Sequence, residues 1–81
     1  MEQRVFRKGN RTVWCRFTVK ERAGRPERHD MTCRSREANG ERRFAELRDM
    51  GGTLEEDLAF FRAFAETDPD PAFLLELFED R

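Results

Sequence analysis

The chain has 81 residues, of which 41% are charged and 37% hydrophobic. A chain of this length forms one small domain that buries only about 60% of its unfolded surface. Its eight Phe residues and single Trp argue against a disordered chain. No apolar run approaches the ~20 residues of a membrane span, and the first residues do not resemble a signal peptide. We therefore expect one domain over residues 1–81, located in the cytoplasm and without a membrane partner.

The charge is distributed unevenly along the chain. Residues 1–48 contain 14 basic and 7 acidic side chains, a net charge of +7, whereas residues 49–81 contain 2 basic and 10 acidic ones, a net charge of −8. Within the domain we therefore expect a basic β-meander over residues 3–36 and an acidic helical part over residues 40–80. Because the two charges nearly cancel, the overall value of −1 says little about partners.

The segment Thr12 to Arg36 predicts a long hairpin folded about Gly24. In such a hairpin, residues whose numbers add to the same value lie opposite one another. One face then carries Val13 with Ser35, Cys15 with Cys33, Phe17 with Met31 and Val19 with His29; the other carries Trp14 with Arg34, Arg16 with Thr32, Thr18 with Asp30 and Lys20 with Arg28. This register separates a mostly apolar face from a basic face with one Trp.

A first strand around Val5 and Phe6 is expected to join this hairpin through residues 8–11, whose Gly-Asn centre suits a two-residue type II′ turn. That turn pairs Phe6 with Val13 and Val5 with Trp14. We therefore predict a three-stranded antiparallel meander in which the second strand is central.

The connection over residues 21–27 contains Pro26, which cannot donate to a strand ladder. We expect the hairpin to open before Pro26. The third strand, roughly residues 28–35, carries alternating charge, which is typical of an edge strand.

Three helical segments are expected after the meander. Residues 41–50 predict a short helix with Phe44 and Leu47 inward, and Gly51-Gly52 would end it. Thr53 and Glu56 fit a capping box that begins a longer helix. Its apolar stripe comprises Leu54, Leu58, Phe61 and Ala65, with Phe60 and Phe64 to the side and Asp57 as the one interruption.

Asp68-Pro69-Asp70-Pro71 breaks that helix, and a last helix of about two turns follows with its apolar residues on one side. Those residues are Phe73, Leu74, Leu77 and Phe78. The predicted fold is thus α+β, a three-stranded antiparallel β-meander followed by two or three C-terminal helices packed on its apolar face.

The basic face is the first candidate site. It would present a Trp among cations: Arg7, Trp14, Arg16, Lys20, Arg28 and Arg34. An aromatic ring among guanidinium groups on an open sheet stacks bases and holds phosphates. The alternative is that Trp14 packs under a helix or a second subunit and that the arginines pair with the acidic half.

The acidic helices are the second candidate site. Glu55, Glu56 and Asp57 form a candidate docking face, because a carboxylate cluster mimics a phosphate backbone and occupies the basic groove of a nucleic-acid-handling protein. The alternative is that these acids only favour the helix N-terminus, where the macrodipole stabilises negative charge.

An apolar interface is the third candidate. A three-stranded sheet has limited area to cover so many rings, so some of Phe60, Phe64, Phe73 and Phe78 are expected to contact another protein or a second copy. In the alternative, two helices fold over each other and hide these rings.

Neither a cofactor nor a metal is expected, because the two Cys lack CxxC spacing and the single His lacks clustered ligands. Cys15 and Cys33 are expected to be buried thiols, although the register would also permit a disulfide. His29 has no accompanying nucleophile, paired carboxylate or phosphate loop, so we expect no enzyme.

We therefore expect a small protein that acts by binding, as an inhibitor or adaptor that docks through charged patches on a larger protein or ribonucleoprotein complex that handles nucleic acid. In size and charge polarity it resembles the accessory proteins of phages and mobile elements, of which anti-CRISPR proteins are one group. The alternatives are a nucleic-acid-binding module that uses the basic face, which in strand pattern resembles the arm-binding domains of phage-type recombinases, and a structural homodimer.

Overall fold

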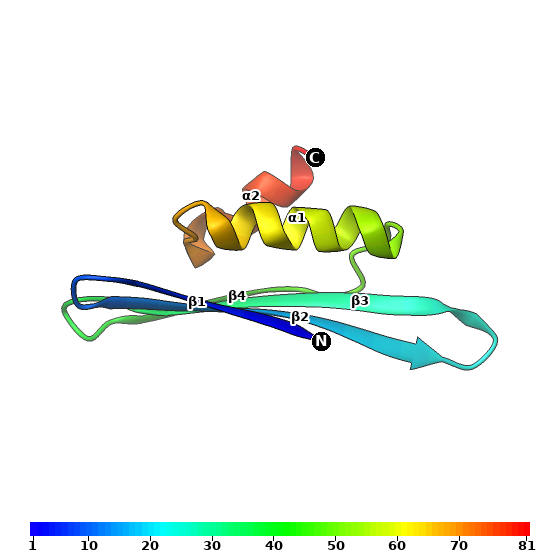
Figure 1. Ribbon diagram of the computed structural model, residues 1–81, viewed down its shortest axis with the longest axis horizontal. Coiled ribbons are helices and arrows are strands. Elements are labelled where there is room, and N and C mark those ends of the chain that lie inside the picture. Colours follow the sequence, from blue (N-terminus) through cyan, green and yellow to red (C-terminus); the bar gives the residue numbers. More distant parts are fainter.

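The computed structural model describes residues 1–81 as a four-stranded antiparallel sheet followed by helices (Figure 1). The strand order is β1-β2-β3-β4, which is also the chain order. The strands are β1 (Glu2–Lys8), β2 (Arg11–Arg22), β3 (Arg25–Arg36) and β4 (Arg42–Leu47). The helical segments are α1 (Leu54–Glu66), the 3₁₀ turn η1 (Pro71–Phe73) and α2 (Leu74–Glu79). The α+β class and the order of sheet before helices are as predicted.

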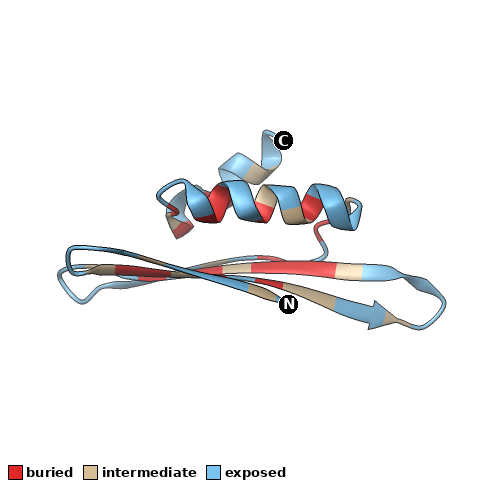
Figure 2. Ribbon diagram, in the orientation of Figure 1, coloured by how far each residue is buried: buried red, intermediate tan, exposed pale blue.

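All the helices lie on one face of the sheet, and the other face is uncovered (Figure 1). Figure 2 shows the buried residues concentrated along the middle of β2 and β3 and on the side of α1 that faces them. The fully buried centre of this core consists of Val13, Cys15, Phe17, Met31, Cys33, Phe61 and Leu74. No helix is long and apolar enough to cross a membrane.

The predicted register of the long hairpin is confirmed. Cys15 pairs with Cys33 and Trp14 with Arg34, and every other predicted pair has the same partner. The first hairpin also has the predicted register, with Val5 opposite Trp14. Gly9 has φ +60, the left-handed value that the first position of a type II′ turn requires of a glycine.

The sheet has four strands, so the prediction of three was wrong, as was the helix over residues 41–50. Residues 42–47 pair with β3, and Arg34 lies opposite Phe44. The spacing of Phe44 and Leu47 suggested one helical face, but along a strand these two residues point to opposite faces. Leu47 is buried against the helices, whereas Phe44 is 63% exposed on the other side. The third strand is therefore internal, and pairing with its free edge outweighed the weak helical pattern.

The long hairpin stays closed at its tip, contrary to the prediction that it opens before Pro26. Arg22 pairs with Arg25 around a two-residue turn, with a register shift between Lys20 and Arg22. Pro26 is exposed at the start of β3, where the loss of one backbone donor costs little. In Figure 1 this tip extends beyond the layer of helices.

The capping box at the start of α1 is confirmed, because the Thr53 hydroxyl accepts from the Glu56 amide at 3.1 Å and the Glu56 carboxylate accepts from the Thr53 amide at 3.3 Å. The buried stripe differs from the predicted one. Leu54 is 44% exposed, and Phe61, Phe64 and Ala65 are buried together with Asp57. The buried side of α1 therefore includes the carboxylate of Asp57, which was expected only to interrupt the apolar stripe.

Asp70 caps the last helical segment, because its carboxylate accepts from the Ala72 amide at 2.9 Å. The predicted common side of this segment is wrong, however. Leu74 is fully buried and Phe78 is half-buried, but Phe73 and Leu77 are 54% and 49% exposed. The physical reason is that the segment starts as a tight 3₁₀ turn, whose three-residue period shifts Phe73 away from the core.

Candidate nucleic-acid interface

The uncovered face of the sheet is formed by every second residue of the strands. Val13, Cys15 and Phe17 are buried beneath the helices, so Trp14 and Arg16 between them point to the opposite side. None of the helices reaches that side (Figure 1). Trp14 is half-buried by its neighbours on the same face. The alternative in which a helix of the same chain covers Trp14 is therefore wrong.

Trp14 belongs to a row of four side chains that crosses the whole sheet. The register places Val5 opposite Trp14, Trp14 opposite Arg34, and Arg34 opposite Phe44. The guanidinium carbon of Arg34 lies 4.8 Å from the centre of the Trp14 ring. Trp14 lies on β2 and Phe44 on β4, so their backbone positions are separated by two strand spacings, roughly 10 Å. The row therefore offers two aromatic surfaces with a cation between them.

Five arginines on this face lie within ion-pairing distance of no carboxylate. They are Arg7, Arg16, Arg34, Arg36 and Arg42. The expected alternative, pairing with the acidic half of the chain, does not occur for these five. Their charges are therefore available to an anionic ligand.

Two shallow hollows flank the Trp14 ring. One, of about 280 Å³, is lined by Val5, Arg16, Thr32 and Phe44, among others. The other, of about 220 Å³, has Arg36 and Arg42 on its wall. Each hollow thus combines an aromatic edge with at least one unpaired guanidinium.

The six residues predicted for the basic face all lie on it, because the strand register places each of them on the same side of the sheet as Trp14. Two of them are engaged at the hairpin end: Arg28 and Lys20 contact Asp30 at 2.8 and 3.5 Å. Burial alone would raise the pKa of Asp30, but the Asp49 amide and Arg28 outweigh it and hold this pKa below its usual value. This end of the face is therefore partly neutralised.

Three residues of this face were missed in the sequence. Arg36 follows from extending the hairpin register, since it lies opposite Thr12. Arg42 and Phe44 could not be found without recognising β4. The second aromatic ring was thus hidden by the mistaken helix.

The predicted acidic docking face is only partly on the surface. Glu55 and Glu56 are exposed, but Asp57 is fully buried. Its Oδ2 accepts from His29 Nδ1 at 2.7 Å and from the Gly52 amide at 3.2 Å, and its Oδ1 accepts from Arg81 at 2.8 Å. Arg81 also donates to the Met50 carbonyl at 3.0 Å. Asp57 therefore joins β3, the loop before α1 and the C-terminus inside the protein.

This arrangement also gives His29 a structural partner. The Nδ1 atom of His29 donates to Asp57, and the His29 carbonyl accepts from the Met50 amide at 2.8 Å. No Ser or Thr and neither Cys is among the hydrogen-bond partners of the ring. No group of His, Cys, Asp and Glu side chains has the arrangement that a metal ion needs.

Cys15 and Cys33 are buried free thiols whose sulfur atoms lie 3.9 Å apart. The contact with Cys15 and burial both raise the pKa of Cys33. The pair therefore lies in the core beneath the helices and contributes no nucleophile to the uncovered face.

Three of the four predicted interface phenylalanines, Phe60, Phe64 and Phe73, line a groove on the layer of helices. Phe64 is buried, Phe60 and Phe78 are half-buried, and Phe73 is more than half exposed. Phe60 and Phe78 pack edge to face with ring centres 5.3 Å apart. The helices thus hide part of this cluster and leave an apolar surface open.

Comparisons of this chain with protein-family models, with curated proteins and with solved structures found no match.

Proposed function

We propose that the uncovered face of the sheet binds single-stranded nucleic acid. The observation that carries this proposal is the cross-strand row of Trp14, Arg34 and Phe44 among arginines that have no carboxylate partner. Two bases stack on the two rings, and the surrounding guanidinium groups bind the phosphates that connect them. Flat sheets with exposed rings suit unpaired bases, whose faces are free.

The energetics support binding at such a surface. Stacking of one base on an aromatic side chain contributes about 1–3 kcal/mol. Each phosphate neutralised on a single strand adds roughly −0.7 to the slope of log K against log salt. If all five unpaired arginines bind phosphates, the slope is about −3.5.

The test uses Trp14 as the reporter, because it is the only Trp in a chain without Tyr. Fluorescence is titrated with an oligothymidylate, an oligouridylate and a DNA duplex at several salt concentrations. We expect quenching by the single strands that weakens steeply with salt. An emission that no oligonucleotide changes would refute the proposal, and tighter binding of the duplex would assign the face to double-stranded DNA.

Two neighbouring arginines provide a matched control. Arg42 lies on the Trp14 face of β4, whereas Arg43, opposite Ser35, lies on the helix-bearing face beside Glu41. Arg42→Glu and Arg43→Glu change the net charge equally. We expect the first to weaken binding about tenfold more than the second. Equal losses would show only a long-range effect of net charge.

A second variant tests stacking without changing the charge. Phe44→Ala removes an exposed ring, so it leaves the fold intact and weakens binding by about 5- to 100-fold. An unchanged affinity would remove Phe44 from the site and contradict a two-ring platform.

The opposite layer supports a second candidate function, an inhibitor or adaptor of the phage or mobile-element type that docks on a nucleic-acid-handling complex. Six carboxylates of the helical segments have no cationic partner: Glu55, Glu56, Glu66, Glu76, Glu79 and Asp80. The variant Glu55→Arg, which leaves the capping box of Thr53 and Glu56 in place, should weaken binding to a basic partner while α1 stays folded. Retained binding would refute a role for this end of the helix. A structural homodimer remains a third proposal, tested by sedimentation.

A further inference from the structure

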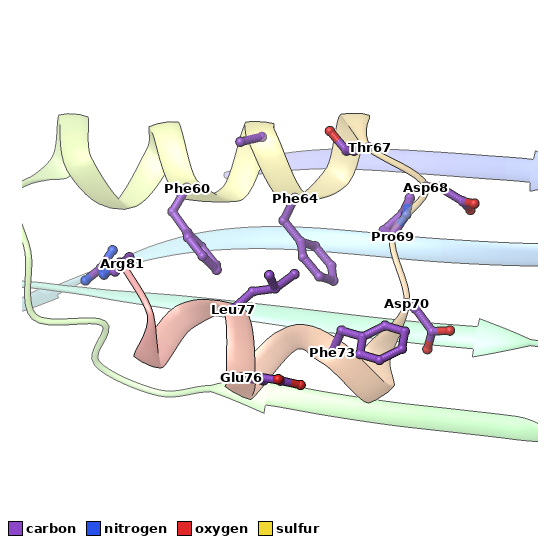
Figure 3. Close-up of a pocket in the computed structure, with 11 residues that line it drawn as sticks. Phe60, Phe64, Thr67, Asp68, Pro69, Asp70, Phe73, Glu76, Leu77 and Arg81 are labelled. Carbon is purple, nitrogen blue, oxygen red and sulfur yellow. The ribbon is translucent and has the colours of Figure 1, made fainter.

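A groove runs along the outer layer between α1 and the η1–α2 segment (Figure 3). Its volume is about 680 Å³, within the usual range for binding pockets. In Figure 3, Phe60 and Phe64 project from α1 toward Leu77 on the facing helix. Arg81 lies at one end of the groove, and Pro69 and Asp70 lie toward the other. The groove therefore has apolar walls contributed by two different helical segments.

The apolar walls are incompletely covered. Phe73 and Leu77 are each about half exposed, although both belong to the lining. Such exposed apolar area, gathered at a concave site with a charged rim, is typical of an interaction surface. Phe73 and Leu77 do not belong to the hydrophobic core, which includes Leu74 of the same helical segment.

The rim of the groove is acidic. Asp68, Asp70 and Glu76 all line it. Arg11 approaches Asp68 and Asp70 at 3.5 and 3.4 Å, but it also binds Glu37 at 2.9 Å. One cation is thus shared among three carboxylates, and Glu76 has none. The rim keeps an excess of negative charge, which favours a basic ligand.

Arg81 does not reverse this balance. Its guanidinium is bound to the buried Asp57 and to the Met50 carbonyl, and it stacks on Phe78 at 4.0 Å. It therefore closes one end of the groove without offering a free positive charge.

We propose that this groove binds a basic amphipathic helix of a partner protein. The apolar face of the partner helix occupies the surface formed by Phe60, Phe64, Phe73 and Leu77, and its Lys or Arg residues lie along the acidic rim. A helix is favoured over a strand because the walls are themselves helices, which present side chains and no free strand edge for added backbone pairing. This inference deepens the second candidate function and does not depend on nucleic-acid binding.

A second copy of this chain fits the groove less well. In a two-fold dimer centred on the groove, the same surface faces itself, so Asp68 and Glu76 of the two copies would approach one another. Like charges that meet at an interface without counterions oppose association. The acidic rim therefore selects a basic partner over self-association.

The experiment uses a fluorescently labelled synthetic helix of Leu and Lys, about four turns long, with Leu at helical spacing on one face. Binding to the full chain is followed by fluorescence anisotropy. A peptide with Glu in place of every Lys is the first control. We expect the Lys peptide to bind and the Glu peptide to bind at least about tenfold more weakly. Equal affinity for the two peptides, or no binding of either, would overturn the proposal.

The chain supplies a matched pair of variants for locating the site. Leu77 lines the groove and is 49% exposed, whereas Leu75 is 54% exposed and lies outside it. Leu77→Lys and Leu75→Lys add the same charge to the same short helix. We expect Leu77→Lys to weaken binding of the Lys peptide by about tenfold or more and Leu75→Lys by about twofold or less. Equal effects of the two substitutions would refute binding in the groove.

A second pair of variants tests whether misfolding accounts for the effect of the Lys substitutions. Phe73→Ala removes a lining ring without adding charge, and Leu75→Ala is its control. We expect only Phe73→Ala to weaken peptide binding, while the thermal midpoints of both variants stay close to that of the parent protein. Equal affinities of these two variants would contradict the proposal as well.

The second candidate function, docking through the acidic helices, can be tested separately from the groove inference. If Glu55→Arg weakens peptide binding and Leu77→Lys does not, the acidic docking function stands and the groove inference falls. If sedimentation shows a dimer that Leu77→Lys dissociates, the groove belongs to a second copy and the inference is overturned.

Discussion

The sharpest test of the fold is the substitution Asp57→Asn. The carboxylate of Asp57 is fully buried and accepts hydrogen bonds from His29, Gly52 and Arg81. An Asn side chain keeps the shape but replaces one oxygen by an amide NH₂. That group must face a donor, and Arg81 loses its counter-charge. The substitution therefore breaks a network that joins α1 to the sheet and to the C-terminus.

The expected cost follows from the burial of the partners. Removing one member of a buried charged pair costs about 3–5 kcal/mol. The Arg81 side chain is 28% exposed, so solvent reduces this figure and we expect about 3 kcal/mol. A chain of this length has a free energy of unfolding of roughly 4–12 kcal/mol. The thermal midpoint should accordingly fall by about 12–24 °C.

The control is Glu55→Gln, which makes the same chemical change two residues earlier. Glu55 is exposed and has no cationic partner, so its loss should change the free energy of unfolding by about 0.5 kcal/mol. Both variants are compared with the parent protein by urea denaturation followed through Trp14 emission and circular dichroism. A loss of less than about 1 kcal/mol for Asp57→Asn would refute the argument that this carboxylate holds the layers together.

Three further predictions concern the interior. Gly52→Ala should be destabilising by about 1–3 kcal/mol in thermal unfolding, because a Cβ at this position would lie 2.7 Å from the buried carboxylate oxygen of α1; an unchanged midpoint would show that the loop yields. Cys15 and Cys33 are buried, so a thiol reagent should modify them only at the rate of unfolding, and rapid labelling in native buffer would contradict this. The pKa of Asp30 is lowered in the folded state, so its contribution to stability is present above its unfolded pKa and is lost as the pH falls through the folded value; Asp30→Asn should therefore show a smaller loss of stability between pH 7 and pH 3 than the parent protein.

The sheet was predictable where the register rests on local signals. The turn at Gly9 and the alternation along β2 predicted the register of the first hairpin and that of the long hairpin as far as Lys20 and Arg28, but not the shifted pairing of Arg22 with Arg25 at its tip. A one-residue slip would move Phe17 to the solvent face, so the apolar pattern excludes other registers. The six basic-face residues followed from the same alternation.

β4 was not predictable on these grounds. Residues 42–47 alternate only weakly, and the strand forms because the edge of β3 offers unpaired backbone groups over the core. That is a tertiary effect, which overrides local propensity. The error moved Phe44 from the uncovered face to the core and thereby concealed the second aromatic ring of the candidate site.

The buried hydrogen-bond network of Asp57 could not be predicted from the sequence pattern either. An acid within an apolar stripe is ordinarily assigned to the edge of the buried face. Its three donors come from β3, from the loop before α1 and from the last residue of the chain. Nothing in their sequence spacing indicates that they converge.

The separation of charge between the two layers bears on function more than on stability. Surface ion pairs stabilise a fold by about 0–1 kcal/mol each, so the folded state gains little from pairing its charges and loses little from leaving them apart. Five arginines on one face of a thin sheet nevertheless repel one another, and six unpaired carboxylates belong to the layer of helices on the opposite face. Because a ligand of opposite charge relieves the repulsion on each face, binding by an anion on the sheet and by a cation on the helices would each lower the free energy of the folded protein. The two sites use different residues and opposite surfaces, so their occupancy should be additive unless the ligands contact each other.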